Sequence, residues 1–242
     1  MLIVGKRRPS PPYNPGVGDL VRAKRQWSPQ LDPVAVKQGF RGWHERGYLP
    51  HRDEPGFVQF VTFRLADSFP LHLRAEWEPL LKIEEETERR RKLEEYLDKG
   101  RGECLLRRPR VARLVEESLL CRHEVDYDLR AWVIMPNHVH VLFQVQSVPM
   151  SQILDAWKGF TAKAINKVLG RRGKIWLDDY WDTYMRDLEH EHRARRYIEN
   201  NPTKVGLVAC RRDWPWSSSR HRDAYERLCL LQRTAPVPGA ET

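Results

Sequence analysis

The stretch that decides the fold is YDLRAWVIMPNHVHVLFQV, residues 127–145. Two runs rich in β-branched and aromatic residues flank the dipeptide Pro136-Asn137, which is typical of a β-hairpin. Because strand side chains alternate, His138 and His140 share one face, about 7 Å apart along the strand. Buried imidazoles need partners for their nitrogens. Two imidazoles at this spacing can bind one metal ion.

Working outward from this hairpin, the pattern of apolar residues predicts the other elements. They are a strand at 57–65, a helix over 71–98 interrupted near Pro79, helices at 109–122 and 150–169, a strand and turn at 174–187, and a helix at 188–201 ended by Pro202. The order β, α(α), β, β, α, β, α predicts an α+β fold. We expect a ferredoxin-like antiparallel sheet with helices on one face.

The chain divides into three parts by composition. Residues 1–56 are predicted to be a basic, partly irregular N-terminal arm, with an ordered loop at 39–56, because they hold several prolines and little periodicity. Residues 57–211 are predicted to form the main domain. Residues 212–242 are predicted to be a basic C-terminal tail, with a short helix near 219–231.

The charge balance favours a polyanionic partner. The 242 residues include 42 Lys and Arg against 33 Asp and Glu, a formal net charge of +9. Such a charge suits nucleic acid, although it also serves solubility alone. No stretch approaches the roughly 20 apolar residues of a membrane span, and the four cysteines form no CxxC pair. We therefore expect a cytoplasmic protein with no membrane partner.

The helix predicted at 150–169 has an apolar stripe and basic residues on its other faces. The stripe is Ile153, Trp157, Phe160, Ala164 and Val168. The candidate phosphate contacts are Lys158, Lys163, Lys167, Arg171 and Arg172, with a solvated helix face as the alternative. Candidates for stacking on unpaired bases are Trp43, Tyr48, Trp157, Trp176 and Trp181, although tryptophans more often lie in a core.

The segment YIENNP, residues 197–202, places Tyr197 and Asn201 on one face of the last helix, because they are four residues apart. Asn201 could complete a metal site while Tyr197 attacks a phosphate. A tyrosyl phosphate ester preserves the bond energy for rejoining. Tyr180 and Tyr184 are rival nucleophiles without the Tyr-x3-Asn pairing.

Three motifs together resemble the REP-associated tyrosine transposases, which belong to the HUH single-strand transposases. They are MPNHVHVL at 135–142, W-x(4)-W-D-x-Y-x-R-D at 176–187 and RYIENNPTKVGLV at 196–208; the resemblance runs from about Phe57 to Trp216. It implies a ferredoxin-like sheet with the histidine pair on a central strand and the catalytic helix near the C-terminus. It also implies a divalent cation, Mg or Mn, bound by His138, His140 and, at the position of a polar third ligand, Asn201.

The resemblance implies that Tyr197 attacks single-stranded, hairpin-forming DNA and leaves a 5′-phosphotyrosine and a free 3′-OH. A monomer is favoured over a homodimer. One alternative is a hairpin-binding protein without strand transfer. Another is a metal hydrolase that also uses His190 and His192, which diverge by about 200° on a helix. Asn137 either shapes the hairpin turn or holds a histidine.

Overall fold

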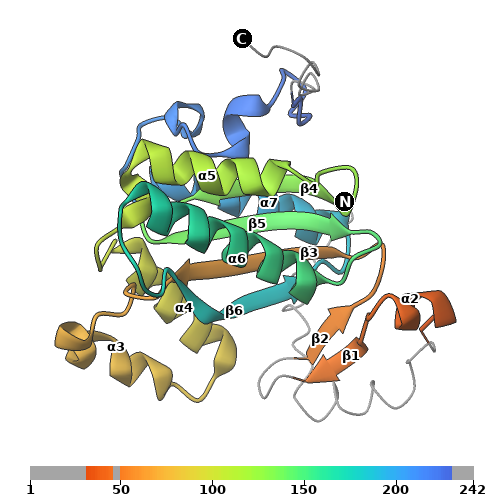
Figure 1. Cartoon of the computed structure of the whole chain (residues 1–242), viewed down its shortest axis with the longest axis horizontal. Coiled ribbons are helices and arrows are strands. Elements are labelled where there is room, and N and C mark those ends of the chain that lie inside the picture. Colours follow the sequence, from red (N-terminus) through yellow and green to blue (C-terminus); the bar gives the residue numbers. More distant parts are fainter. Residues whose placement is uncertain (1–30, 46–49, 231–242) are drawn as a thin grey trace, which may run out of the picture.

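The computed structural model describes residues 31–45 and 50–230. A four-stranded antiparallel sheet forms its centre, with the order β4-β5-β3-β6 (Figure 1). The strands are β3 Val58–Leu65, β4 Tyr127–Ile134, β5 His138–Val145 and β6 Trp176–Tyr184. The predicted α+β antiparallel sheet is confirmed, and the histidine pair lies on an inner strand.

The hairpin of β4 and β5 is the one predicted around Pro136-Asn137. Val133 lies opposite His140 in β4, and Thr62 lies opposite His140 in β3. Nearly every residue of β5 is buried, on both faces of the sheet. A strand that is buried on both faces needs a cover on each side, which explains where the helices lie.

Helices α5 Pro109–Leu120 and α6 Met150–Val168 cover one face and enclose the larger core. This core includes Val139, Val141 and Phe143 of β5. Helix α6 is turned relative to the predicted stripe, because Phe160 and Val168 are 58% and 45% exposed. The buried positions instead include Thr161 and Ile165, and Trp176 Nε1 donates to Thr161 Oγ1 at 2.8 Å.

Helix α7 Leu188–Lys204 covers the opposite face, behind the sheet in Figure 1. It packs Ala194 and Ile198 against Ala131, Val133 and Leu142. The prediction that the helices share one face was therefore wrong for α7. The helix also continues past Pro202, because a proline in the last turn removes only one backbone hydrogen bond.

The segment between β3 and α5 is largely helical. It holds a 3-10 helix at Leu71–Leu73, α3 Arg74–Leu81 and α4 Glu86–Asp98, and a further 3-10 helix at Leu105–Arg107 precedes α5. Pro79 lies inside α3, and the break follows Leu81. Side-chain bonds tie α4 to two other elements, since Arg90 donates to Thr183 Oγ1 in β6 and Tyr197 of α7 donates to Glu94.

The described part of the N-terminal arm is more regular than predicted. It contains α2 Pro33–Lys37 and an antiparallel hairpin of β1 Gly42–Glu45 and β2 Pro50–Asp53. Asp32 caps α2 by accepting from the Val34 amide at 2.8 Å. The remainder of the predicted arm, and the stacking candidate Tyr48, lie outside the described residues.

The C-terminal segment packs on α7 through a buried carboxylate. Glu199 is fully buried and accepts from Ser218 Oγ at 2.7 Å and from Arg222 Nε at 2.8 Å. Short 3-10 helices occur at Arg211–Asp213 and Ser218–His221, so the helix predicted at 219–231 is largely absent from its described part. In residues 31–45 and 50–230, no helix has the length and apolar character that a membrane crossing requires.

Candidate active site

The two histidines of β5 meet under α7. Their Nε2 atoms lie 3.1 Å apart, and each residue is 1% exposed. Strand alternation places them on the face of Leu142, opposite Val139 and Val141. The hairpin therefore brings both imidazoles to the place where the sheet meets the C-terminal helix.

Asn137 fixes the tautomer of His138. Its Nδ2 donates to the carbonyl oxygen of Arg101 at 3.0 Å, so its Oδ1 faces His138 Nδ1 at 2.8 Å. An amide oxygen only accepts, so the proton of the neutral ring lies on Nδ1 and the lone pair of Nε2 faces the site. Asn137 thus both occupies the hairpin turn and holds a histidine, the two alternatives that the sequence left open.

His140 has a matching pair of partners. Its Nδ1 lies 2.8 Å from Thr62 Oγ1, and Asn201 Nδ2 donates to its Nε2 at 3.3 Å. Burial lowers the pKa of His138 to about 3, and burial followed by the neighbouring His138 lowers the pKa of His140 well below its ordinary value. Both rings are therefore neutral, which is the form that binds metals.

The site fits a divalent cation in two respects. Two Nε2 lone pairs 3.1 Å apart match neighbouring ligands at about 2.1 Å from one ion. Asn201 is fully buried, and its Oδ1 has no hydrogen-bond partner. Within the described ranges, no three His, Cys, Asp or Glu side chains converge on one point. The buried, unpartnered Asn201 Oδ1 is the candidate for a third ligand.

Tyr197 of α7 lies beside the two histidines. Its ring is 5.6 Å from that of His140 and 6.0 Å from that of Phe60, and its hydroxyl donates to Glu94 Oε2 at 3.1 Å. Burial, and then the charges of Glu94 and Asp98, raise the pKa of Tyr197 far above its ordinary value. The hydroxyl is therefore protonated at neutral pH and needs an acceptor before it can attack.

The rival tyrosines face the other way. Tyr180 belongs to the core under α5 and α6, on the far side of the sheet. Tyr184 is four residues further along β6 and so shares that face. His190, in the first turn of α7, is about 16 Å along the helix from Asn201. The structure brings none of these residues to the histidine pair.

Two carboxylates of α4 lie beside the histidines and Tyr197, and neither was predicted from the sequence. Glu94 and Asp98 are four residues apart on one helix face. Asp98 Oδ1 lies 3.8 Å from His138 Nε2, while Lys204 Nζ of α7 donates to Asp98 Oδ2 at 2.9 Å. The only sequence feature that could have indicated them is their i, i+4 spacing, which is equally typical of a solvated helix.

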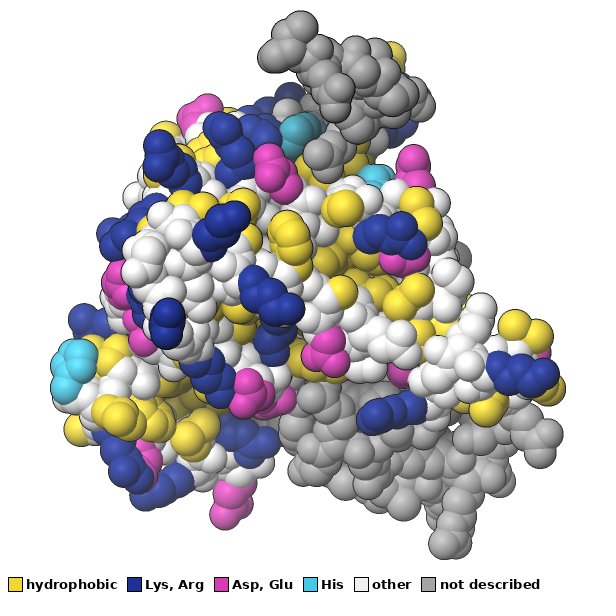
Figure 2. Space-filling view, viewed as in Figure 1, with side chains coloured by type: hydrophobic (Ala, Val, Ile, Leu, Met, Phe, Trp, Pro, Cys, Tyr) yellow, Lys and Arg dark blue, Asp and Glu magenta, His cyan; other side chains and the backbone are white. Residues whose placement is uncertain are grey.

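The basic residues predicted to bind DNA do not join this site. They are Lys158, Lys163, Lys167, Arg171 and Arg172, in α6 or just after it. Helix α6 lies across the sheet from the histidines, and Figure 2 shows Lys and Arg side chains spread among apolar ones on that face. Lys158 Nζ donates to the Asp178 carbonyl at 2.7 Å, and Arg171 pairs with Glu103. The stacking candidates Trp157 and Trp176 are buried in the core.

Other cations lie near the histidines. Arg64 and Lys204 lower the pKa of His138, and Arg90 lowers that of His140. The Arg64 guanidinium lies over the Trp181 ring, 4.4 Å from its centroid. These three cations are therefore on the side of the histidine pair, whereas the basic residues of α6 lie across the sheet from it.

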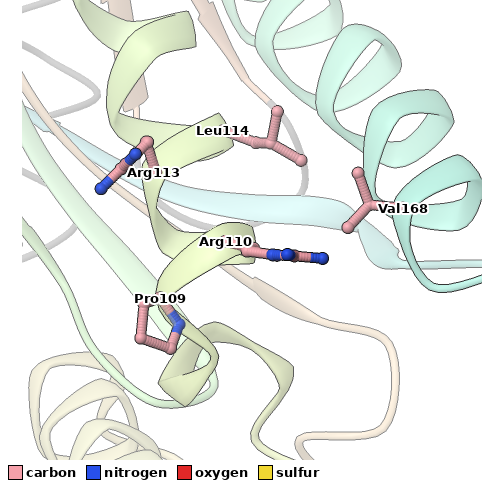
Figure 3. Close-up of a pocket in the computed structure, with 5 residues that line it drawn as sticks. All are labelled: Pro109, Arg110, Arg113, Leu114 and Val168. Carbon is pink, nitrogen blue, oxygen red and sulfur yellow. The ribbon is translucent and has the colours of Figure 1, made fainter.

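A hollow lies between α5 and α6. Pro109, Arg110, Arg113, Leu114 and Val168 line it, with Leu114 and Val168 on opposite sides in Figure 3. It is shallow and mostly apolar, and the sheet separates it from the histidine pair. No candidate catalytic side chain lines it.

Comparison with known proteins points to one family. The profile of the family described as "Transposase IS200 like" matches residues 108–201, which include both histidines, Tyr197 and Asn201. A curated protein of Haemophilus influenzae (strain Rd), named as a REP-associated tyrosine transposase, is 28% identical over 114 residues. That alignment covers 43% of this chain and 64% of the relative, so the chain spans less than two thirds of the relative's length.

Two solved structures are also similar. A REP-associated tyrosine transposase bound to a REP hairpin has 18% identity and a TM-score of 0.45, covering 82% of this chain and 97% of its own. A protein of Deinococcus radiodurans R1 described as a transposase has 14% identity and a TM-score of 0.29. That alignment covers 65% of this chain and 96% of the Deinococcus protein. Residues 108–201, which hold the histidine pair and the Tyr197–Asn201 pair, therefore match the IS200-like transposase family, and the chain is distantly similar to a REP-associated tyrosine transposase.

Proposed function

We propose that this protein cleaves and rejoins single-stranded DNA through a covalent bond to Tyr197. The observation that carries the proposal is that Tyr197 and Asn201 of α7 meet His138 and His140 of β5 in one buried site. Nucleophile and ligand candidates from distant parts of the sequence converge there.

His138, His140 and Asn201 would hold a divalent cation, Mg or Mn. Such a cation polarises a phosphate oxygen and stabilises the charge that develops as a P–O bond breaks. Asn137 and Thr62 orient the two imidazoles through their Nδ1 atoms. Partners of this kind fix the ring orientation and the tautomer of metal-binding histidines.

Tyr197 acts as the nucleophile in this proposal. The bond between its hydroxyl oxygen and phosphorus forms while the bond from phosphorus to the 3′ oxygen breaks. The hydroxyl proton passes to Glu94, which already accepts it in a hydrogen bond, and the departing 3′ oxygen takes a proton from water. A 5′-phosphotyrosine and a free 3′-OH result, and attack by a 3′-OH reverses the step without ATP.

Charge near the site suits a phosphate chain. Arg64, Arg90 and Lys204 would attract the phosphates that flank the reacting one. The basic residues of α6 would contact phosphates further from the reacting one, such as those of a hairpin stem. The hairpin form of the substrate follows from the resemblance of the motifs at 135–142, 176–187 and 196–208 to the REP-associated tyrosine transposases.

A denaturing gel tests this proposal. Wild type, Tyr197→Phe and the control Tyr184→Phe are each incubated with labelled hairpin oligonucleotides and Mn²⁺. We expect a slow-migrating, protease-sensitive adduct with wild type and Tyr184→Phe, and none with Tyr197→Phe. An adduct that survives in Tyr197→Phe would refute the assignment. A shifted band on a native gel without any adduct would instead favour the hairpin-binding alternative.

A further inference from the structure

The last turn of α4 carries a carboxylate, Asp98, of which one buried oxygen has no hydrogen-bond partner in the described residues. The Asp98 side chain is 9% exposed. Its Oδ2 accepts from Lys204, but its Oδ1 has no hydrogen-bond partner. A buried, unsatisfied acceptor of this kind costs free energy. The oxygen is nevertheless kept 3.8 Å from His138 Nε2.

His138 supplies no proton between these two atoms. Asn137 holds the proton of His138 on Nδ1, so Nε2 presents a lone pair toward Asp98. The separation is also too long for a hydrogen bond. A carboxylate oxygen and a nitrogen lone pair that face each other repel, and a cation between or beside them removes the repulsion.

The predicted ligand set has no charge of its own. Two neutral imidazoles and an amide balance none of the charge of a divalent ion, whereas Mg²⁺ and Mn²⁺ prefer oxygen ligands and carboxylates. Asp98 is the acidic side chain that faces His138, and Lys204 holds its second oxygen. Asn201 Oδ1 is a second buried oxygen without a partner in the same site.

We propose that Asp98 is the acidic partner of this cation site: its Oδ1 accepts a hydrogen bond from a water molecule bound to the ion and supplies negative charge beside the histidines. Asp98 is thus a positioning residue that acts through the water. Magnesium-like ions usually keep several waters in proteins, which such a carboxylate orients. The inference rests on the proposed metal site and adds a residue from α4 to it.

Direct titration of the full-length protein with Mn²⁺, without DNA, tests this inference. Free Mn²⁺ is followed by electron paramagnetic resonance. We expect Asp98→Asn to weaken Mn²⁺ binding by about 10–100-fold, the usual effect of removing a partner of this kind. Asp98→Glu, which restores the charge, is expected to recover part of the affinity. Asp178→Asn is the control, because Asp178 is 89% exposed and pairs with Lys174.

Thermal unfolding of each variant shows that it is folded, and His140→Ala separates the two possible failures. If His140→Ala loses Mn²⁺ binding while Asp98→Asn binds as wild type does, the role of Asp98 is refuted and the metal site stands. If His140→Ala also binds as wild type does, the proposed metal site itself is refuted. Equal losses in Asp98→Asn and Asp98→Glu, with both variants folded, would also contradict a role based on charge.

Discussion

The two faces of β5 bury different kinds of side chain. Toward α5 and α6, the strand presents Val139, Val141 and Phe143 to a large core. Toward α7, it presents His138 and His140, whose nitrogens all have polar neighbours. One strand thus supports stability on one side and holds the candidate chemistry on the other. Changes on the first face should affect folding, whereas changes on the second should affect activity.

The largest expected effect on stability lies on the face of α5 and α6. Phe143→Ala removes a fully buried ring that packs against Tyr127 and Trp157. We expect a loss of about 3–5 kcal/mol in the free energy of unfolding, measured with urea. Phe160→Ala is the control, because Phe160 is exposed on α6 and should change stability little. A large loss in Phe160→Ala would show that α6 is oriented as the sequence predicted.

Each face also buries a tyrosine with a raised pKa, and Tyr127 is the one that lies away from the site. Burial raises the pKa of Tyr127 to about 12, and its hydroxyl donates to the Leu119 carbonyl at 2.7 Å. Above pH 10 the unfolded chain loses this proton while the folded protein keeps it. The stability that Tyr127 supplies is therefore complete below pH 10 and lost toward pH 12.

Urea unfolding between pH 9 and 12 checks this effect. At pH 9 the free energy of unfolding of wild type should exceed that of Tyr127→Phe by about 1 kcal/mol, the usual contribution of one hydrogen bond. The difference should shrink or reverse by about pH 12, since a gap of about two pKa units corresponds to roughly 2–3 kcal/mol. A constant difference over this range would contradict the assigned burial.

The smallest expected effect concerns α6, on the face away from the tyrosine. A double variant, Lys163→Ala with Lys167→Ala, should weaken DNA binding modestly. The slope of log affinity against log salt should fall by about 1 for each phosphate that the variant no longer neutralises. Adduct yield at saturating DNA should not change. An unaltered slope would exclude these lysines from DNA binding, and an absent adduct would place α6 in the reaction.

The sequence was most informative where periodicity and chemistry agreed. The hairpin around Pro136-Asn137 and the Tyr197–Asn201 pair could be predicted, because strand alternation and helix spacing fix which side chains share a face. The face of each helix could not be predicted so well. Alternation separates the two faces of β5 but does not assign α6 and α7 to either one.

Contacts between residues far apart in the sequence could not be predicted either. Glu94 and Asp98 lie in a charged run that is typical of a solvated helix, and only tertiary packing shows that this run faces Tyr197 and His138. The basic residues of α6 show the converse, because their helical pattern gave no indication that the sheet separates them from the histidines. Asn137 lay within reach of sequence reasoning, since it directly precedes His138.

Mapping of the covalent adduct tests the central claim most directly. After reaction with hairpin DNA, nuclease treatment and trypsin digestion leave a nucleotide on the peptide that holds the nucleophile. Cleavage after Arg196 and Lys204 gives residues 197–204, which contain Tyr197 as their only tyrosine. We predict that mass spectrometry finds the nucleotide on this peptide. A nucleotide on residues 175–186, which hold Tyr180 and Tyr184, would contradict the account.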